Sequence, residues 1–537
     1  MDSVPRSRQA TFRFGVASAK ADESAGSRQQ SADAGIFVPA GVPLALVLVV
    51  QTVLSLRVVR ADTAFQDEAE YLWAGHLEWS HWLHGTPIPP FGSYFSGAPV
   101  LFPPLGAIAD SLGGLTGARI LSLAFMLGAT CLLYFAARRL CGRQAAFFAA
   151  ILFAIAGPTL HLGSFATFDA MAAFLVALSV LLVVRAGGRK EAASSMIIAA
   201  VVLALANATS YATVIYDPVV ILLALVTAFP RPGGRLAVGR SLILLAVLSV
   251  VLTVGLLIGG SAYLHGFDVT TVQRVSGSDP VLTILTDAWS WTGVVVVLAL
   301  CGVAASYLAR ERASRTLLFG LLTLAAVIAP AEQTTLHTLA SLNKHDDLGI
   351  WFAAVAAGYA VDRLISAASP GWMQAVTCGA CLVGLAFPVA LGMQQSRTFA
   401  TAWPDSSSFV KILGPILART PGPVLVEDPA PAEYYLHAES QWKRWSSTRN
   451  IVLSSGASTG GPSASAGVVG AGDPVAFARF IANGYFTVVA LNFADTTSLD
   501  HSILSDLRKS HTYQIVSVVP YGLAPGTYII YRYEPHL

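Results

Sequence analysis

The sequence predicts a multi-spanning α-helical membrane protein that carries a small C-terminal α/β domain. Of its 537 residues, 54% are hydrophobic and only 12% are charged, and the mean hydropathy is +0.62. Soluble domains, by contrast, are roughly 25% charged. Apolar runs long enough to cross a bilayer recur between residues 36 and 393, whereas 394–537 is much more polar.

The chain begins with a polar segment, 1–35, whose basic residues favour the cytoplasm. It lacks the apolar core and small-residue cleavage site of a signal peptide, so we expect a disordered cytoplasmic tail. We expect about eleven spans in a transmembrane domain over 36–393. The apolar runs are 36–58, 116–137, 144–162, 169–185, 193–211, 212–229, 241–263, 290–309, 315–332, 348–364 and 371–393. The segment 99–113 is short and proline-rich, which predicts a re-entrant or interfacial element.

The loops between these runs alternate in charge. One set is rich in arginine, and the other is acidic, histidine-rich or aromatic. Basic loops face the cytoplasm in multi-pass membrane proteins. The pattern therefore predicts a plasma-membrane protein with its N-terminus inside. The odd number of spans then places the C-terminal domain, 394–537, and the acidic loops outside.

The polar C-terminal part shows short buried strands at 423–427, 486–491 and 527–531. Segments 405–418, 474–483 and 499–509 read as helices between or near them, which predicts a small extracytoplasmic α/β domain. The Gly/Ser/Ala-rich stretch 454–472 predicts a flexible loop. No glycine-rich phosphate-binding motif follows any of these strands.

The remaining composition limits the partners. A net charge of +2 gives no reason to expect nucleic-acid binding. All five cysteines lie in or beside apolar runs, and we interpret Cys378 and Cys381, one helical turn apart, as packing residues. No group of ligands has the spacing of a structural metal site. A divalent ion bridging Asp67 or Asp169 to a phosphate stays possible, and no other cofactor is expected.

Carboxylates cluster at one end of the predicted spans. Asp67 and Glu68 follow the first apolar run, in an outer loop at 59–115 whose tryptophans suggest an interfacial helix, and Asp169 stands where the third run passes to the fourth. Acidic groups beside hydrocarbon are costly and usually functional or paired. We therefore expect an outer cavity for phosphate chemistry, with a carboxylate base and with cations or donors from Arg119, His337, Lys344 and His345.

At these residues the sequence resembles the GT-C superfamily of membrane glycosyltransferases. The likeness is to its polyprenyl-phosphate-dependent branch, the protein O-mannosyltransferases and aminoarabinose transferases, and it covers about 60–185. The matching motifs are Asp67-Glu68 followed by Tyr71, Pro103-Pro104-Leu105, Ala118-Arg119, Arg138-Arg139 followed by Gly142-Arg143, and Asp169.

The resemblance implies an inverting transfer of a sugar from a polyprenyl-phosphate donor to a glycan, lipid or protein acceptor of the cell envelope, on the outer face. Asp67 would act as the base, and Asp169 would be the second catalytic residue. The residues expected to bind substrate are Glu68, Tyr71, Arg119, His337, Lys344 and His345. The C-terminal domain would bind the acceptor.

One departure from the family pattern concerns the donor phosphate. The family often has a lysine just before Pro-Pro-Leu, where this chain has Phe102. Phosphate binding would then fall to Lys344 and His345, or the donor differs. High Ala, Arg and Gly usage with little Lys suggests an actinobacterial source, and hence decaprenyl or undecaprenyl phosphate as carrier.

Two other functions fit the sequence less well. A transporter or flippase of lipid-linked substrates would show related halves and polar groups near the bilayer midplane. This chain shows no such repeat, and its charges lie toward one face. A non-catalytic scaffold that recruits cell-envelope partners would leave the acidic first loop without a purpose.

Overall fold

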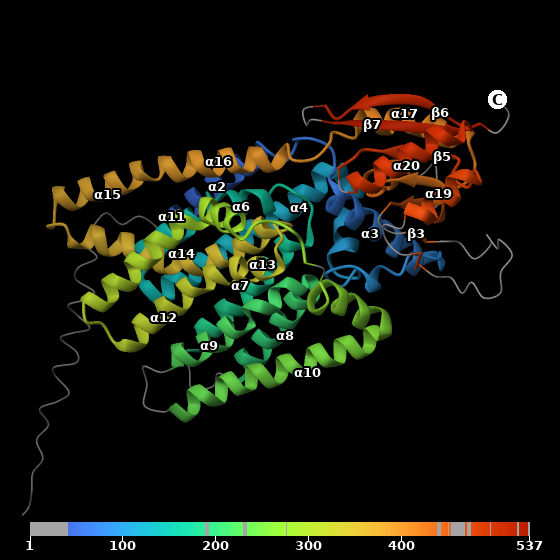
Figure 1. Ribbon diagram of the computed structural model, residues 1–537. Helices are drawn as coiled ribbons and strands as arrows, with labels where there is room; N and C mark the ends of the chain where they lie inside the picture. The colour runs from blue at the N-terminus through green and yellow to red at the C-terminus, as the bar shows by residue number, and fades with distance from the viewer. Residues whose placement is uncertain are drawn as a thin grey trace, which may run out of the picture. The chain divides into compact units, whose positions relative to one another are not determined.

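The computed structural model describes residues 41–187, 193–228, 234–274, 276–437, 442–448, 451–452, 468–469, 474–494, 496–522 and 526–534 (Figure 1). The expected tail at 1–35 and most of the expected loop at 454–472 lie outside these residues. Contacts divide the chain into Met1–Ala45 and Leu46–Leu537. All contacts described below lie within the second unit.

The chain is a multi-pass helical membrane protein. In the described ranges, eight helical segments are long and apolar enough to span a membrane. They are α4 (Phe102–Cys141), α7 (Phe168–Ala186), η3 with α9 (Tyr211–Tyr216, Asp217–Ala228), α10 with η4 (Gly234–Phe267, Asp268–Val272), α11 (Val281–Leu308), α12 with η5 and α13 (Ala313–Leu324, Ala325–Val327, Ile328–Leu336), α14 (Leu342–Ala367), and α15 with α16 (Trp372–Gly384, Ala386–Ala400). Shorter apolar helices are α2 (Gly41–Leu56), α5 (Arg143–Ala154) and α8 (Ala193–Thr209).

At two places the helices of the structure differ from the apolar runs that the sequence analysis defined. The segment 99–113 is helical from Phe102 and continues into α4, but the backbone leaves helical geometry at Gly113 and Gly114, where φ of Gly114 is 60°. Its first turns therefore form a separate arm. Further along, Ile155 and Ala156 interrupt the run 144–162, and a short α6 (Gly157–Leu162) starts with Pro158 at its N-terminus.

The arm packs against α3 (Gln66–His84), a helix of the first outer loop. Gly75 on α3 makes this approach possible, because a Cβ there would lie 1.9 Å from the carbonyl oxygen of Pro103. Trp79 Nε1 donates to the carbonyl oxygen of Pro104 at 2.9 Å. The two prolines thus begin the arm and also provide carbonyl groups that fix α3 beside it.

Helix α14 is the most deeply buried of the eight spans. It packs against α11 and α5, and glycines allow these backbones to approach closely. A Cβ at Gly302 of α11 would lie 2.2 Å from the Ala356 carbonyl oxygen, and one at Gly358 would lie 2.3 Å from that of Ala145. By contrast, α10 and the pair α15–α16 bury little of their apolar surface within the chain. Those helices therefore present apolar faces suited to lipid.

The C-terminal part forms a mixed sheet with strand order β2-β1-β5-β7-β6. Strands β2 (Trp445–Ser447), β1 (Val424–Val426) and β5 (Val488–Leu491) run parallel, whereas β7 (Thr527–Tyr533) and β6 (Tyr513–Pro520) are antiparallel to their neighbours. A separate two-stranded ladder joins β3 (Ile451–Val452) to β4 (Val468–Val469). The sequence predicted β1, β5 and β7 but missed β2 and β6, and most of the middle residues of β6 are exposed although several are apolar.

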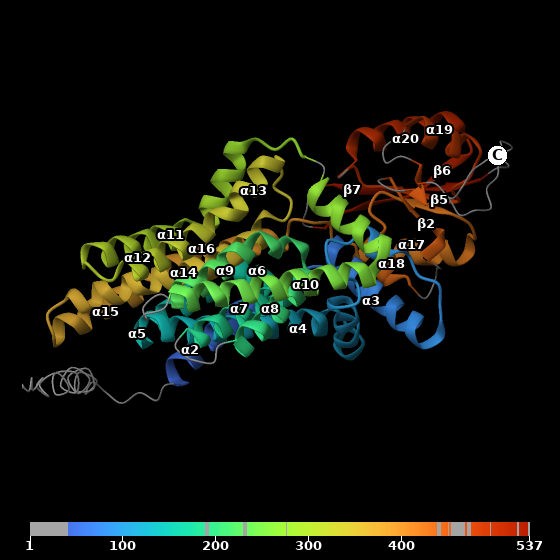
Figure 2. The same cartoon turned by 90° about the horizontal axis from the view of Figure 1, so that it is seen from below.

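Helices cover both faces of this sheet, as Figure 2 shows. Alternate residues of β1 point to opposite faces: Val424 and Val426 pack against α17 (Ser407–Arg419), and Leu425 packs against α19 (Pro474–Ala482). Helix α20 (Thr497–Ser510) shares the second face. These helices match the predicted segments closely. The remaining helical pieces, η2 (Phe91–Ser93), α18 (Ala430–Tyr435) and η6 (Trp442–Arg444), lie in connections.

Candidate active site

The two aspartates singled out by the sequence meet at one lysine. Lys344 Nζ donates a hydrogen bond to Asp67 Oδ2 and lies 3.7 Å from Asp169 Oδ2. The side chain of Asp67 is 33% exposed, whereas those of Asp169 and Lys344 are 11% and 9% exposed. Residues separated by 277 positions along the chain thus form a carboxylate–ammonium–carboxylate cluster, of which Asp67 is the most accessible member.

Each member of this cluster comes from the first turn of a helix. Asp67 lies in the first turn of α3, Asp169 in that of α7, and Lys344 in that of α14. A helix N-terminus carries a partial positive charge, which stabilises carboxylates and also attracts phosphate. Lys344 is unfavourable for the α14 dipole, and the two carboxylates offset that effect. Residues 344–347, which precede the predicted run 348–364, are helical.

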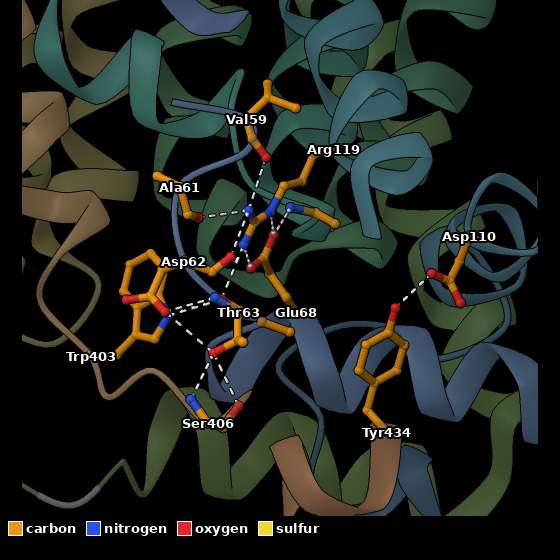
Figure 3. Close-up of polar contacts among 12 residues, drawn as sticks. Val59, Ala61, Asp62, Thr63, Glu68, Asp110, Arg119, Trp403, Ser406 and Tyr434 are labelled. Atoms are coloured by element: carbon orange, nitrogen blue, oxygen red, sulfur yellow. Dashed lines mark hydrogen bonds and ion pairs between the residues drawn. The ribbon is translucent and has the colours of Figure 1, made fainter. Parts of the chain in front are cut away.

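Glu68 and Arg119 lie beside the cluster in a fully buried ion pair, shown in Figure 3. Arg119 Nε and Nη2 donate to the two Glu68 oxygens at 2.8 and 2.7 Å. The other Arg119 donors bind backbone carbonyl oxygens: Nη1 those of Val59 and Ala61, both at 2.9 Å, and Nη2 that of Thr63 at 3.2 Å. All five N–H groups of the guanidinium therefore have acceptors.

The burial of this pair bears on the expectation that Glu68 and Arg119 bind substrate. Glu68 is 0% and Arg119 is 1% exposed, so neither side chain reaches a substrate in this structure. Glu68 Oε1 instead also accepts the backbone N–H of Ala166 at 2.7 Å, three residues before Asp169. The pair joins the segment entering α3 to the turn entering α7. We call Glu68 and Arg119 the clamp, because their contacts connect the helix turn that carries Asp67 to the turn that precedes Asp169.

Tyr71 lies one helical turn after Asp67 and is buried. Its ring stacks on Phe168 at a centroid distance of 4.4 Å and meets Phe95 edge-on at 5.4 Å. Burial raises the pKa of the Tyr71 hydroxyl well above its usual value, and the negative charges of Asp67 and Asp169 raise it further. Tyr71 is therefore a neutral hydroxyl beneath the carboxylates at physiological pH.

A narrow cavity adjoins the cluster. It is lined by Asp169, Ser210, Tyr216, Lys344 and His345, among others. The cavity volume is about 10 Å³, which is space for roughly one water molecule. Ser210 Oγ lies 3.4 Å from Asp169 Oδ1, and His345 Nδ1 lies 3.1 Å from Gln333 Nε2.

His337 does not join this group. Its side chain is exposed, it ends α13 with φ of 48°, and its backbone accepts a hydrogen bond from Asp279 N. The sequence had suggested it as a substrate ligand because it stands near Lys344 along the chain. Arg274, which sequence reasoning missed, donates through Nη2 to the Ala340 carbonyl oxygen at 3.4 Å, close to the start of α14. A lone arginine in a loop on the non-basic side was the signal that could have revealed it.

A bridging divalent ion does not fit the carboxylate pair as arranged. The ammonium of Lys344 takes the place between Asp67 and Asp169 in which such an ion would bind. Within the described part of the chain, no group of three or more His, Cys, Asp or Glu side chains could hold a metal. All five cysteines are free thiols.

Comparisons with known proteins agree with this architecture. Residues 90–256 match the family model of dolichyl-phosphate-mannose-protein mannosyltransferase. No curated protein sequence matches the chain closely enough to count as a relative. Among solved structures, ArnT from Cupriavidus metallidurans bound to undecaprenyl phosphate is 15% identical with a TM-score of 0.58, covering 92% of this chain and 98% of that one.

Two further structures are similar over most of this chain. The archaeal oligosaccharyltransferase AglB from Archaeoglobus fulgidus, in complex with an inhibitory peptide and a dolichol-phosphate, is 15% identical with a TM-score of 0.55, covering 88% of this chain and 72% of that one. The arabinofuranosyltransferase AftD from Mycobacteria is 16% identical with a TM-score of 0.54, covering 92% of this chain and 40% of that one. At these identities the likeness establishes the fold. The chain therefore has the GT-C fold, and its residues 90–256 match the family model of dolichyl-phosphate-mannose-protein mannosyltransferase.

Proposed function

We propose that this chain transfers a sugar from a polyprenyl-phosphate donor to an acceptor of the cell envelope, with inversion at the anomeric carbon. The reaction would occur on the extracytoplasmic face of the plasma membrane. The observation that carries the proposal is the ammonium of Lys344 held by Asp67 and close to Asp169, where the first turns of α3, α7 and α14 meet. The GT-C fold supports the same reaction class.

Asp67 is the candidate base because it is the more exposed of the two aspartates. In the proposed step, an acceptor hydroxyl attacks the anomeric carbon and passes its proton to the Asp67 carboxylate. The bond between that carbon and the phosphate oxygen breaks, and its electron pair leaves with polyprenyl phosphate. A positioned general base typically contributes about 10²–10⁴-fold to such a rate.

The leaving phosphate gains negative charge, which needs a cation and oriented N–H groups. Lys344 is the described cation at the cluster, and the helix N-termini provide the field. In this proposal, the donor phosphate draws Lys344 away from Asp67, which frees that carboxylate to accept the proton. Asp169 keeps the lysine oriented. Phe102, at the position of the family's lysine, is fully buried among apolar side chains and takes no part.

The C-terminal domain is the proposed acceptor-binding part. Its contacts with the segment that enters α3 support this role. Trp403 Nε1 donates to the carbonyl oxygen of Thr63 at 3.0 Å, and Ser406 N donates to Thr63 Oγ1 at 2.9 Å (Figure 3). Tyr434 also donates to Asp110 Oδ1 at 2.6 Å. An acceptor bound by this domain would lie near the base.

Two measurements test the proposal separately. The first is binding of undecaprenyl phosphate to purified protein, which Lys344→Met should weaken at least tenfold while Asp67→Asn has little effect. The second is release of polyprenyl phosphate from synthetic sugar donors in the presence of cell-envelope extract. Asp67→Asn should lower that rate at least about 100-fold. Asp62→Asn is the matched control, because Asp62 Oδ1 accepts Thr63 N at 2.7 Å, an interaction that asparagine keeps.

The outcomes separate the candidate functions. Transfer that persists in Asp67→Asn would remove Asp67 as base. Unchanged lipid-phosphate binding in Lys344→Met would remove the phosphate role of that lysine. Movement of lipid-linked substrate across proteoliposomes without any sugar transfer would favour a flippase instead.

A further inference from the structure

A second, much larger cavity lies at the other end of the helix bundle. Its volume is about 690 Å³, within the range of roughly 300–1,000 Å³ that is usual for ligand sites. Helix α7 starts at the aspartate cluster and lines this cavity with Val184 near its C-terminal end. Gly187, which also lines it, follows Asp169 by eighteen positions at the end of this helix, so the two sites are about 27 Å apart along the helix.

The rim of this cavity carries unneutralised positive charge. Arg139, Arg312 and Arg315 line it, with Glu311 as the acidic member. Glu311 is already engaged: its Oε2 lies 3.2 Å from Arg315 Nε, and its Oε1 accepts the Tyr359 hydroxyl at 2.7 Å. The Arg315 guanidinium also lies 5.0 Å from the Tyr359 ring centroid. Arg315 and Glu311 thus neutralise each other within a fixed cluster.

Arg139 and Arg312 are different. Both are exposed, and in the residues that the structure covers neither forms an ion pair with an acidic side chain. Arg139 Nη2 only approaches the Arg185 carbonyl oxygen at 3.5 Å. Below them the wall is apolar, formed by Leu140, Val184 and Leu318. The cavity therefore combines two free guanidinium groups with an apolar wall at the basic end of the membrane helices.

We propose that this cavity binds the phosphate-bearing head group of an anionic phospholipid. Guanidinium groups bind phosphate with two parallel hydrogen bonds, and basic pockets between membrane helices on the cytoplasmic side recognise anionic lipid head groups. The apolar wall would contact the first carbons of the acyl chains. A free phosphate ion would use the arginines alone. This site is independent of the proposed sugar transfer.

Native mass spectrometry of the full chain in detergent tests this site. Phosphatidylglycerol and phosphatidylcholine are added as probes, and their retention is compared in Arg139→Gln, Arg312→Gln and Arg138→Gln. Arg138 is the matched control, because it is exposed and adjacent to Arg139 but does not line the cavity. Each cavity variant should weaken phosphatidylglycerol retention about fivefold, and the control less than twofold. Added inorganic phosphate should leave that retention unchanged.

A fourth variant distinguishes a specific loss of lipid binding from a loss caused by misfolding. Ser314 lines the cavity as the second residue of α12. Ser314→Glu adds a negative charge that favours the helix N-terminus while it repels phosphate. We expect it to lose phosphatidylglycerol without a lower unfolding temperature. Equal retention of both lipids, equal loss in Arg138→Gln, retained lipid in Ser314→Glu, or displacement by inorganic phosphate would each overturn the proposal.

Discussion

Replacing Arg119 with methionine tests whether the clamp sets the geometry of the active site. Methionine fills similar space but removes five N–H donors and the positive charge. Glu68 would then remain fully buried without its cation, and the carbonyl oxygens of Val59 and Ala61 would lose their side-chain donor. Breaking a buried ion pair in this way costs about 3–5 kcal/mol. Because Glu68 also holds Ala166, the effect should reach Asp169.

The assay is thermal unfolding of detergent-solubilised protein, with hydrogen exchange of the segments 57–66 and 164–168 as a local readout. Arg119→Met should lower the unfolding temperature by roughly 3–10 °C and speed exchange in both segments. The double variant Glu68→Gln with Arg119→Met removes the stranded charge and should recover part of the loss. Arg119→Lys keeps the charge but offers only three donors, so it should fall between wild type and methionine.

Arg138→Met is the matched control, since Arg138 is an exposed arginine of the same helix. It should unfold like the wild type. The reasoning about the clamp would be refuted by an Arg119→Met protein that unfolds within about 1 °C of wild type. It would also fail if the double variant were less stable than the single one, because the stranded Glu68 charge would then not be the main cost.

Two further predictions follow from packing and from titration. Gly75→Ala should destabilise the protein by about 1–3 kcal/mol in thermal unfolding, because its Cβ would collide with Pro103. Gly113→Ala, where no atom lies within 4 Å of the added Cβ, should change stability by less than about 1 kcal/mol. In the C-terminal domain, burial together with the hydrogen bond and charge of Glu427 raises the pKa of Asp500 to about 8. The protonated carboxyl then stabilises the fold fully below about pH 4 and loses this effect as the pH rises through about 8. Unfolding temperatures measured from about pH 5 to about pH 9 should fall, and Asp500→Asn should flatten that trend.

The sequence predicted the membrane class and the C-terminal α/β domain because both depend on local composition. Short apolar runs identified β1, β5 and β7, and the longer ones located the long helices. Edge strand β6 was missed, although Ile515 and Val518 are apolar; in the structure both are exposed. The sequence separated 99–113 from the span at 116–137, but it did not show that the two form one helix with a kink at Gly113–Gly114. Such features depend on tertiary packing, which a single sequence does not display.

The candidate site was partly predictable for the same reason. Asp67 and Asp169 stood out because charge is rare beside apolar runs. Their meeting at Lys344 depends on how α14 packs among the other helices, which no spacing reveals. Composition alone does not distinguish Asp67 from Glu68, and only the family resemblance gave them different roles. On a helix, however, adjacent side chains point about 100° apart, so one faces the cluster and the other enters the core.

The different positions of Asp67 and Glu68 connect the C-terminal domain to the proposed catalytic carboxylates. Arg119 Nη2 donates to the carbonyl oxygen of Thr63, and the same oxygen accepts the indole N–H of Trp403 from the segment leading into the C-terminal domain. Any movement of that domain on acceptor binding would therefore act directly on the clamp. Glu68, which directly follows Asp67, accepts the Ala166 amide and so connects Asp67 to the turn that carries Asp169. In the proposed reaction, the spacing of the two carboxylates therefore depends on a buried arginine, which gives a physical reason for a fully satisfied guanidinium beside the cluster.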